Sequence, residues 1–433
     1  MLFRTLLIAA IIIVFYSLAK WRKLSVELSL LAATIGGALA GSIFSSPPPA
    51  EIPRHLVEGS FTYLDVILVF FTATLFITII QKSGGVDFAV RRTVVRFYRS
   101  RFLALLLLMV IVLIPGALTG AGSVSLLVVG APVALALRGL GVEEKKIPAI
   151  LFILAGLAAA APPVNIWAMM LCAGTAIPYV GFELPLGLPV IILGILTVAI
   201  LGRRKGAAEI DSFLEKITPH PGMNWLRLLL PFLVFFGLVL AYRLFPFNFP
   251  VLGLPLEFLT ASLVALVLSP VRLNLIRVAS ETLRKLLPLL AIMVIVGMLQ
   301  QILSASGVKG LISYSVLIIP LGLLFCLLPV IIPVSEGVLT YGGAAIIGIP
   351  LVWYLNSLGY HATVVISGLS LLWPLGDGLP PTALIGRLSV MVSGYQGKYW
   401  QFLKETWIPW LIITATGMLM IIFSAKLKFL VTG

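Results

Sequence analysis

The sequence predicts an all-helical protein that crosses a membrane many times and is built from two inverted repeats. Three observations predict this fold class: the composition, the recurrence of apolar runs, and a set of proline and glycine positions that recurs at a fixed spacing. Of the 433 residues, 60% are hydrophobic and 11% are charged, and the mean hydropathy is +1.14. Because a water-soluble domain has about a quarter of its residues charged, this composition excludes one.

Apolar runs of about 20 residues recur along the whole chain, and each is long enough to cross a hydrocarbon core of about 30 Å. We expect membrane spans over residues 4–19, 25–44, 61–82, 147–177, 186–202, 225–246, 252–270, 287–304, 362–391 and 406–425.

Two further apolar regions, 102–138 and 317–349, are divided in the middle. We expect two segments of about 14 residues in each, and at about 1.5 Å per residue one such segment reaches only about 21 Å. That length is too short to cross the membrane. Each region is therefore predicted to be a re-entrant helical hairpin, which enters and leaves on the same side.

The distribution of charge predicts the orientation. The net charge is +14, but the basic residues stand in short loops between apolar runs, where Lys and Arg set topology rather than bind nucleic acid. With the N-terminus outside and both hairpins re-entrant, 24 of the 30 Lys and Arg residues face the cytoplasm. We expect a multi-pass protein of a prokaryotic cytoplasmic (inner) membrane, with lipid as its surroundings.

Three local features complete the topology. Lys20, Arg22 and Lys23 directly follow the first apolar run, as the flanking charges of a retained span do, so we expect no cleavage there. Residues 87–101 are predicted to form an amphipathic helix in the cytoplasmic interface. The most polar stretch, 203–223, is predicted to be a cytoplasmic linker between the repeats 1–202 and 224–433.

An internal repeat is indicated by proline and glycine residues that recur 218 positions apart. Proline and glycine carry more weight here than leucine, because each constrains the backbone. The matched positions are Pro115 with Pro333, Gly130 and Pro132 with Gly348 and Pro350, Leu140-Gly141 with Leu358-Gly359, and Pro162-Pro163 with Pro380-Pro381. Each repeat would then hold three spans, a hairpin, a broken helix (147–177 or 362–391) and a last span.

The breaks of the first repeat are uncharged. The hairpin tip over 115–125 is rich in glycine and hydroxyl groups, and the break over 161–165 contains two prolines and an asparagine. Unwound carbonyls can coordinate Na⁺, and helix N-termini can hold an anion. Close packing of helices through small residues is the alternative interpretation.

The breaks of the second repeat, 334–343 and 374–382, carry two carboxylates inside apolar segments, Glu336 and Asp377. An ionisable group inside the membrane is by default a functional hypothesis. Both residues are candidates for Na⁺ ligation or proton transfer, and a structural cap on the next half-helix is the alternative for Asp377.

The candidate site residues follow from these breaks, and no cofactor other than a coupling Na⁺ or H⁺ is expected. The substrate-binding candidates are Thr119, Ser123, Ser125, Asn165, Ser335, Thr340 and Thr382. The ion-coupling candidates are Gly116, Gly120, Gly122, Pro162, Glu336, Gly337, Gly376, Asp377 and Pro380. The candidate Na⁺ ligands are Ser123, Asn165, Glu336 and Asp377.

The breaks give the sequence a family resemblance. TGAGSVS over 119–125, followed about forty residues later by Pro162-Pro163, resembles the large membrane subunit of tripartite ATP-independent periplasmic (TRAP) transporters, within a wider ion-transporter superfamily. Glu336, Pro350 and the Gly-rich segment 376–381 resemble the second half of that family. The sequence departs from the family in lacking a run of consecutive serines, which leaves a stand-alone permease open.

The resemblance implies a scaffold domain, a mobile transport domain formed by the hairpins and broken helices, and an elevator motion. It also implies Na⁺-coupled uptake of a small organic anion such as a dicarboxylate, together with a small membrane subunit and a periplasmic or extracellular substrate-binding protein. Exchange of a cation for protons at Glu336 and Asp377 is the alternative function. A membrane enzyme is not expected, because the spans contain no His or Cys pair.

Overall fold

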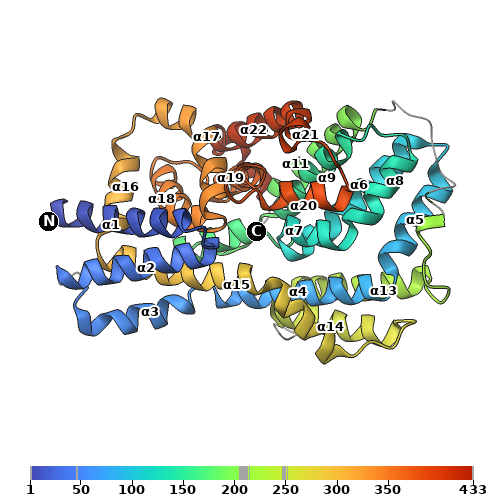
Figure 1. The fold of residues 1–433 in the computed structure, drawn as a ribbon, viewed down its shortest axis with the longest axis horizontal. Helices are drawn as coiled ribbons and strands as arrows, with labels where there is room; N and C mark the ends of the chain where they lie inside the picture. The colour runs from blue at the N-terminus through green and yellow to red at the C-terminus, as the bar shows by residue number, and fades with distance from the viewer. Residues whose placement is uncertain are drawn as a thin grey trace.

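The helices form two layers in the computed structural model, which describes residues 2–44, 47–203, 213, 215–245, 250 and 252–431 (Figure 1). No β-strand occurs among these residues. The all-helical prediction is therefore confirmed for the described part of the chain. The predicted linker over 203–223 falls partly outside it, and so do Arg204 and Lys205 of the predicted cytoplasmic set.

The first layer holds the long antiparallel helices. α3 and α4 run alongside α15, whose 31 residues reach about 46 Å, while α14 packs on α4 and α13 (Figure 1). The helices of this layer are α1 (Leu2–Trp21), α2 (Val26–Ile43), η1 (Pro49–Glu51), α3 (Ile52–Ser60), α4 (Leu64–Lys82), α13 (Trp225–Leu244), α14 (Gly253–Leu268) and α15 (Leu275–Ala305).

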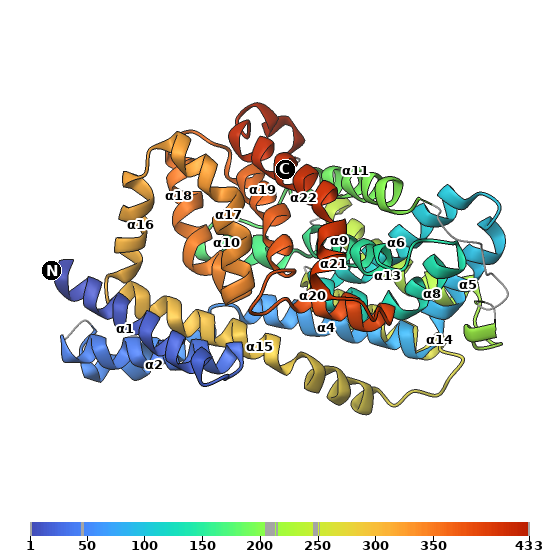
Figure 2. The ribbon, with the colours of Figure 1, turned by 45° about the horizontal axis from the view of Figure 1, so that its top comes forward.

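The second layer holds the predicted hairpins and broken helices, and it remains stacked on the first when the molecule is turned (Figure 2). Its helices from the first half are α6 (Arg101–Thr119), α7 (Gly122–Ser125), the π-helix η2 (Leu126–Gly130), α8 (Ala131–Gly139), α9 (Lys146–Ala160), α10 (Ile166–Thr175) and α11 (Glu183–Leu201). Those from the second half are α17 (Leu321–Leu339), the π-helix η3 (Ala344–Gly348), α18 (Ile349–Ser357), α19 (Ala362–Gly376), α20 (Leu384–Ser393), α21 (Tyr399–Glu405), α22 (Trp407–Ile422) and η4 (Lys426–Leu430).

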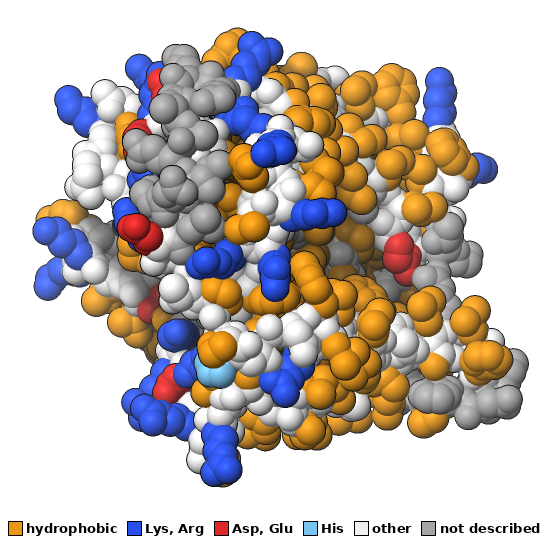
Figure 3. Space-filling model, turned by 90° about the vertical axis from the view of Figure 1, so that its right-hand side faces the viewer, with side chains coloured by type: hydrophobic (Ala, Val, Ile, Leu, Met, Phe, Trp, Pro, Cys, Tyr) orange, Lys and Arg blue, Asp and Glu red, His pale blue; other side chains and the backbone are white. Residues whose placement is uncertain are grey.

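Two shorter helices lead from the first layer to the second at opposite ends of the molecule, α5 (Gly85–Phe97) and α16 (Val308–Ile318) (Figure 1). Lys and Arg side chains gather on the face at the α5 end (Figure 3). Arg92, Arg96 and Arg99, which belong to the set predicted to face the cytoplasm, are exposed in this part of the chain.

Nine helical stretches in the described residues are long and apolar enough to cross a membrane, or ten if the bent pair α21 and α22 counts as one span. This supports a multi-pass membrane protein. The predicted length of the hairpin segments was wrong, however. α6 and α17 each have 19 residues, and the return from Gly122 to Gly139 has 18. The length of these segments therefore does not exclude a full crossing.

The reason for that error is that both hairpin prolines lie inside helices. Pro115 lies within α6 and Pro333 within α17, so neither helix stops at its proline. A proline removes one N–H, and in a membrane protein neighbouring groups can satisfy the carbonyl that it frees. As a result the first tip is shorter than predicted and is centred on Gly120 and Ala121, where α6 ends and α7 begins.

The broken helices are interrupted close to the predicted positions. α9 ends at Ala160 and α10 begins at Ile166, which coincides with the predicted break over 161–165. α19 ends at Gly376 and α20 begins at Leu384, so the second break covers 377–383 rather than 374–382. The peptide bond between the two prolines is cis in both breaks.

Candidate functional site

A narrow pocket lies where the hairpin tips meet the second broken helix, and its empty volume is about 240 Å³. It receives residues from both halves of the chain and from both layers. The start of α7, the end of α17, the break after α19, the start of α20 and one residue of α15 form its wall. The lining residues are Gly122, Ser123, Leu289, Glu336, Thr340, Tyr341, Asp377, Leu384 and Ile385.

Glu336 is held in the last turn of α17, where 1% of its surface is exposed. Its carboxylate oxygen Oε2 accepts a hydrogen bond of 3.0 Å from the indole Nε1 of Trp167 in α10. The Trp167 ring packs against Tyr341, with ring centroids 5.4 Å apart. One half of the chain therefore supplies the carboxylate, and the other supplies the donor that orients it.

Asp377 reaches the same pocket because α19 crosses α17 with almost no space between their backbones. A Cβ atom added to Gly376 would lie 2.0 Å from the carbonyl oxygen of Pro333 and 2.7 Å from Cβ of Glu336. Only glycine permits this approach. The next residue, Asp377, is 5% exposed and lines the pocket with Glu336.

The pocket combines two acids with two helix N-termini. α20 begins at Leu384, and the helical run of α7, η2 and α8 begins at Gly122, and both residues line the pocket. The N-terminal end of a helix carries a partial positive charge, which stabilises anions. No Lys, Arg or His belongs to the lining set. The described residues also contain no group of three or more His, Cys, Asp and Glu that would hold a metal ion.

The structure brings together some of the predicted site residues and leaves others apart. Ser123, Glu336, Thr340, Asp377 and Gly122 line the pocket. Of the four candidate Na⁺ ligands, three are therefore in one place. The fourth, Asn165, is not among the lining residues.

Asn165 instead closes the first break. Its Oδ1 accepts a hydrogen bond of 2.9 Å from the backbone N–H of Ala168, and its Nδ2 donates one of 2.9 Å to the carbonyl of Ala160. Tyr179 completes the closure, because its hydroxyl donates to the carbonyl of Pro163 and accepts from the N–H of Asn165, each at 3.1 Å. The polar groups of the first break are thus paired with nearby groups of the protein, including the carbonyl of Ala117 in α6, which accepts from the N–H of Val164 at 3.0 Å.

Most of the other predicted hydroxyls donate to backbone carbonyls. Such bonds use the single hydroxyl proton, so these side chains remain available only as acceptors. The bonds are Thr119 to Pro115 (2.7 Å), Ser125 to Val112 (2.5 Å), Ser335 to Ile332 (2.7 Å), Thr340 to Leu339 (2.7 Å) and Thr382 to Gly337 (2.9 Å).

The predicted glycines serve close packing between helices. A Cβ at Gly116 would lie 2.4 Å from Cβ of Ala158, and one at Gly122 would lie 2.4 Å from the carbonyl oxygen of Ala155, so α6 and α7 press on α9. Gly337 faces the carbonyl of Gly376. Gly120 has a φ of +69°, which the turn after α6 requires. Pro162 and Pro380 lie in the two breaks.

Several residues around the site were missed by the sequence analysis. Trp373 donates from Nε1 to the hydroxyl of Ser335 at 3.3 Å, next to the bond between Trp167 and Glu336. Tyr399 donates to the carbonyl of Gly378 at 2.8 Å in the second break. Aromatic residues that carry a polar group, close to a break in the helix, were the available signal.

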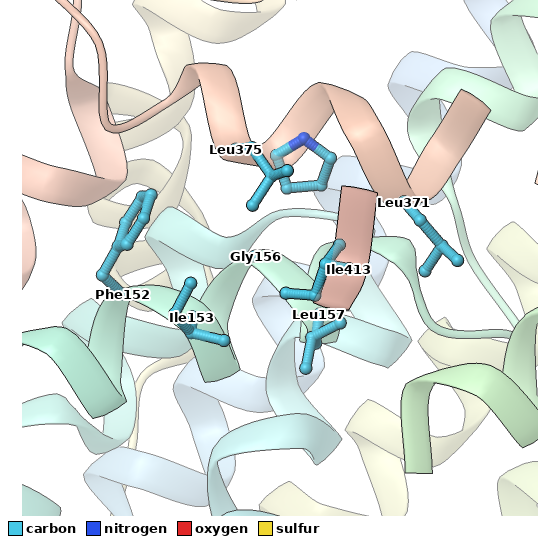
Figure 4. Close-up of a pocket in the computed structure, with 8 residues that line it drawn as sticks. Phe152, Ile153, Gly156, Leu157, Leu371, Leu375 and Ile413 are labelled. Atoms are coloured by element: carbon cyan, nitrogen blue, oxygen red, sulfur yellow. The ribbon is translucent and has the colours of Figure 1, made fainter. Parts of the chain in front are cut away.

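A second pocket, with an empty volume of about 210 Å³, lies behind the second break between α9, α19 and α22 (Figure 4). Phe152, Leu371, Leu375 and Ile413 are among the residues that line it, and all its lining side chains are apolar. Such walls offer an ion no ligands. The polar pocket at Glu336 and Asp377 is therefore the better candidate site.

No protein-family model matches the sequence, and no curated protein matches it. The fold is similar to two solved membrane transporters. The YdaH transporter of Alcanivorax borkumensis superposes with a TM-score of 0.58 at 14% identity, over 86% of this chain and 88% of YdaH. MtrF of Neisseria gonorrhoeae, from a class of antimetabolite efflux pumps, gives a TM-score of 0.63 at 15% identity, over 86% and 84%.

These comparisons give the chain the fold of known membrane transporters. They do not support the resemblance to the large subunit of TRAP transporters, since YdaH belongs to the AbgT family, which is a distinct family.

Proposed function

We propose that the chain is a secondary active transporter that binds its coupling cation, Na⁺ or H⁺, at Glu336 and Asp377. The supporting observation is that two buried carboxylates share one pocket whose lining contains no basic residue. A buried charge is costly unless an opposite charge or hydrogen bonds accompany it. A bound cation supplies that opposite charge, and protonation removes the need for it.

The two layers favour an elevator mechanism. In this proposal the first layer is the scaffold, and the second layer carries the site across the membrane. α5 and α16 are the connections that would permit the movement (Figure 1). Leu289 of α15 lines the pocket from the scaffold side, so a movement of the second layer along α15 would uncover the pocket.

Two modes of transport are supported, each by one observation. The helix N-termini at Gly122 and Leu384 favour a small organic anion, carried with Na⁺. The lack of a basic lining residue favours exchange of Na⁺ for protons without an organic substrate. The proposal of anion cotransport also includes a small membrane subunit and a substrate-binding protein. It places the protein in the inner membrane with its N-terminus outside.

Cation binding is tested by measuring how much radioactive Na⁺ the purified protein binds. Proton movement is tested with a pH-sensitive dye in proteoliposomes under an imposed Na⁺ gradient. Glu336→Gln and Asp377→Asn keep the size of each side chain and remove its charge. Glu257→Gln is the matched control, because Glu257 is another buried acid, in α14, that does not line the pocket.

We expect both site variants to lose at least tenfold in Na⁺ affinity, or to lose proton movement, while Glu257→Gln behaves as the wild type (a factor of ten is about 1.4 kcal/mol). Proton movement driven by Na⁺ alone supports exchange. Movement that requires an added small carboxylate supports cotransport. Wild-type binding and transport in both site variants would overturn the proposal.

A further inference from the structure

The two hairpins share a backbone defect at equivalent places. In each, a π-helix is followed directly by an α-helix whose second residue is proline: η2 leads to Pro132 in α8, and η3 leads to Pro350 in α18. In a π-helix a carbonyl pairs with the N–H five residues later. For Leu127 and Ala345, which are 218 residues apart, that residue is the proline, which has no N–H.

A glutamine side chain from the first layer supplies the missing donor in each hairpin. Nε2 of Gln300 in α15 donates a hydrogen bond of 2.9 Å to the carbonyl of Ala345. Nε2 of Gln81 in α4 donates bonds of 3.1 Å to the carbonyls of Leu127 and Val128. In both halves a scaffold amide therefore completes the hydrogen bonding of the hairpin.

The two contacts differ in burial. Gln300 is 7% exposed, and its Oε1 accepts a bond of 2.8 Å from the hydroxyl of Tyr63, so both ends of its amide are fixed. Leu127, at the other contact, is 48% exposed. A buried carbonyl without a donor is costly, and Gln300 makes a single bond of 2.9 Å, whereas Gln81 divides its amide between two carbonyls at 3.1 Å. The contact at Gln300 is the stronger of the two.

We propose that Gln81 and Gln300 are a matched pair of positioning residues that dock the two hairpins on α4 and α15 and must be released when the second layer moves. The proposal rests on the elevator form of the proposed function. Backbone partners within a helix move with it, but these two donors stay on the scaffold. Each contact therefore marks one position of a hairpin along the scaffold, and its strength contributes to the barrier for leaving that position.

The first experiment tests the bond by a double-mutant cycle on thermal stability. Gln300→Met removes the amide and keeps an unbranched side chain, while Pro350→Ala restores a backbone N–H. Gln301→Met is the control, since Gln301 adjoins Gln300 and its side chain makes no hydrogen bond within the described residues. We expect Gln300→Met to lower the unfolding temperature, Pro350→Ala to remove most of that effect, and Gln301→Met to change nothing.

The second experiment tests docking by distance measurements between two spin labels in liposomes. Labels at Glu58 on α3 and Ser357 on α18 report on the position of the second hairpin against the scaffold, and both sites are exposed. The native cysteines, Cys172 and Cys326, are replaced first. We expect Gln300→Met to raise the population of a second, undocked distance about tenfold, the effect of one lost hydrogen bond.

Three results would overturn the docking proposal: equal distance distributions in Gln300→Met and Gln301→Met, an effect that Pro350→Ala leaves unchanged, or a loss of stability with no undocked population. Separate variants test the proposed function and the docking contact. If Glu336→Gln keeps full cation binding while Gln300→Met still undocks the hairpin, the cation site is wrong and the docking contact stands.

Discussion

The crossing of α17 and α19 permits a sharp test, because a single methyl group added at Gly376 has no room. That methyl would lie 2.0 Å from the carbonyl oxygen of Pro333, 2.7 Å from Cβ of Glu336 and 2.8 Å from the carbonyl carbon of Pro333. Non-bonded carbon atoms pack at about 3.5–4.0 Å. In Gly376→Ala the two helices must therefore separate by about 1 Å or more.

Overpacking of this kind costs about 1–3 kcal/mol, and we expect the upper end of that range, because two of the three clashing atoms are backbone. The separation also moves Asp377 away from Glu336. Thermal unfolding in detergent should show the loss of stability, and binding of radioactive Na⁺ should fall with it.

The matched control is Gly322→Ala, which makes the same change in α17 at a position with nothing within 4 Å. Alanine is a better helix former than glycine, so we expect this variant to be unchanged or up to about 1 kcal/mol more stable. If Gly376→Ala unfolds at the temperature of Gly322→Ala and binds Na⁺ normally, the close crossing does not hold the two carboxylates together.

Three further predictions follow from contacts of the site and of α5. Trp167→Phe keeps the ring but removes the donor to Glu336, and thermal unfolding should show a loss of about 2 kcal/mol. Tyr179→Phe leaves the carbonyl of Pro163 without its donor, and the same assay should show a loss of about 1–3 kcal/mol. Burial raises the pKa of Asp87 in α5 from its ordinary value of 3.8, so the folded state favours the protonated acid. The stability that the protonated Asp87 contributes is present below pH 3.8 and is lost as the pH rises through the raised pKa. Asp87→Asn should therefore gain stability over the wild type as the pH rises from 3.8 through that pKa. Equal pH profiles for the two proteins would refute this.

The helices and the first break could be predicted from the sequence because their causes are local. Long apolar runs demand helices in a membrane. At Pro162 and Pro163 two consecutive residues lack an N–H, so the helix cannot continue, and α9 stops at Ala160. A lone proline is less decisive, because a helix can continue past it as α6 does past Pro115, and for this reason Pro115 was wrongly taken as the start of the first hairpin tip.

The partners of the site could not be predicted, because they come from distant parts of the chain. Trp167 and Glu336 are separated by 169 residues, and no pattern around either indicates the other. The two docking glutamines, in contrast, stand at positions that the sequence makes noticeable. Gln81 and Gln300 are polar residues near the ends of apolar runs, and Pro132 and Pro350 already belonged to the repeat. The sequence does not show that the helix becomes π-helical before each of these prolines. That change determines which carbonyls lose their donor.

The asymmetry between the halves follows from how each break is satisfied. In the first break Asn165 and Tyr179 pair with the local backbone, so no charge is required there. In the second break the backbone is satisfied in other ways: the carbonyl of Asp377 accepts from the N–H of Gly386, and that of Gly378 accepts from Tyr399. The carboxylate of Asp377 is therefore not needed for the fold of its own loop, and it faces the pocket with Glu336.

The pocket nevertheless depends on the first half of the chain. Trp167 orients Glu336, and Gly122 and Ser123 bring a helix N-terminus to the two acids. If the second half were produced alone, its carboxylates would lack both the indole donor and this partial positive charge, and their burial would be unfavourable. The second half thus provides the two carboxylates, and the first half provides the indole donor and the helix N-terminus that partly offset the cost of burying them.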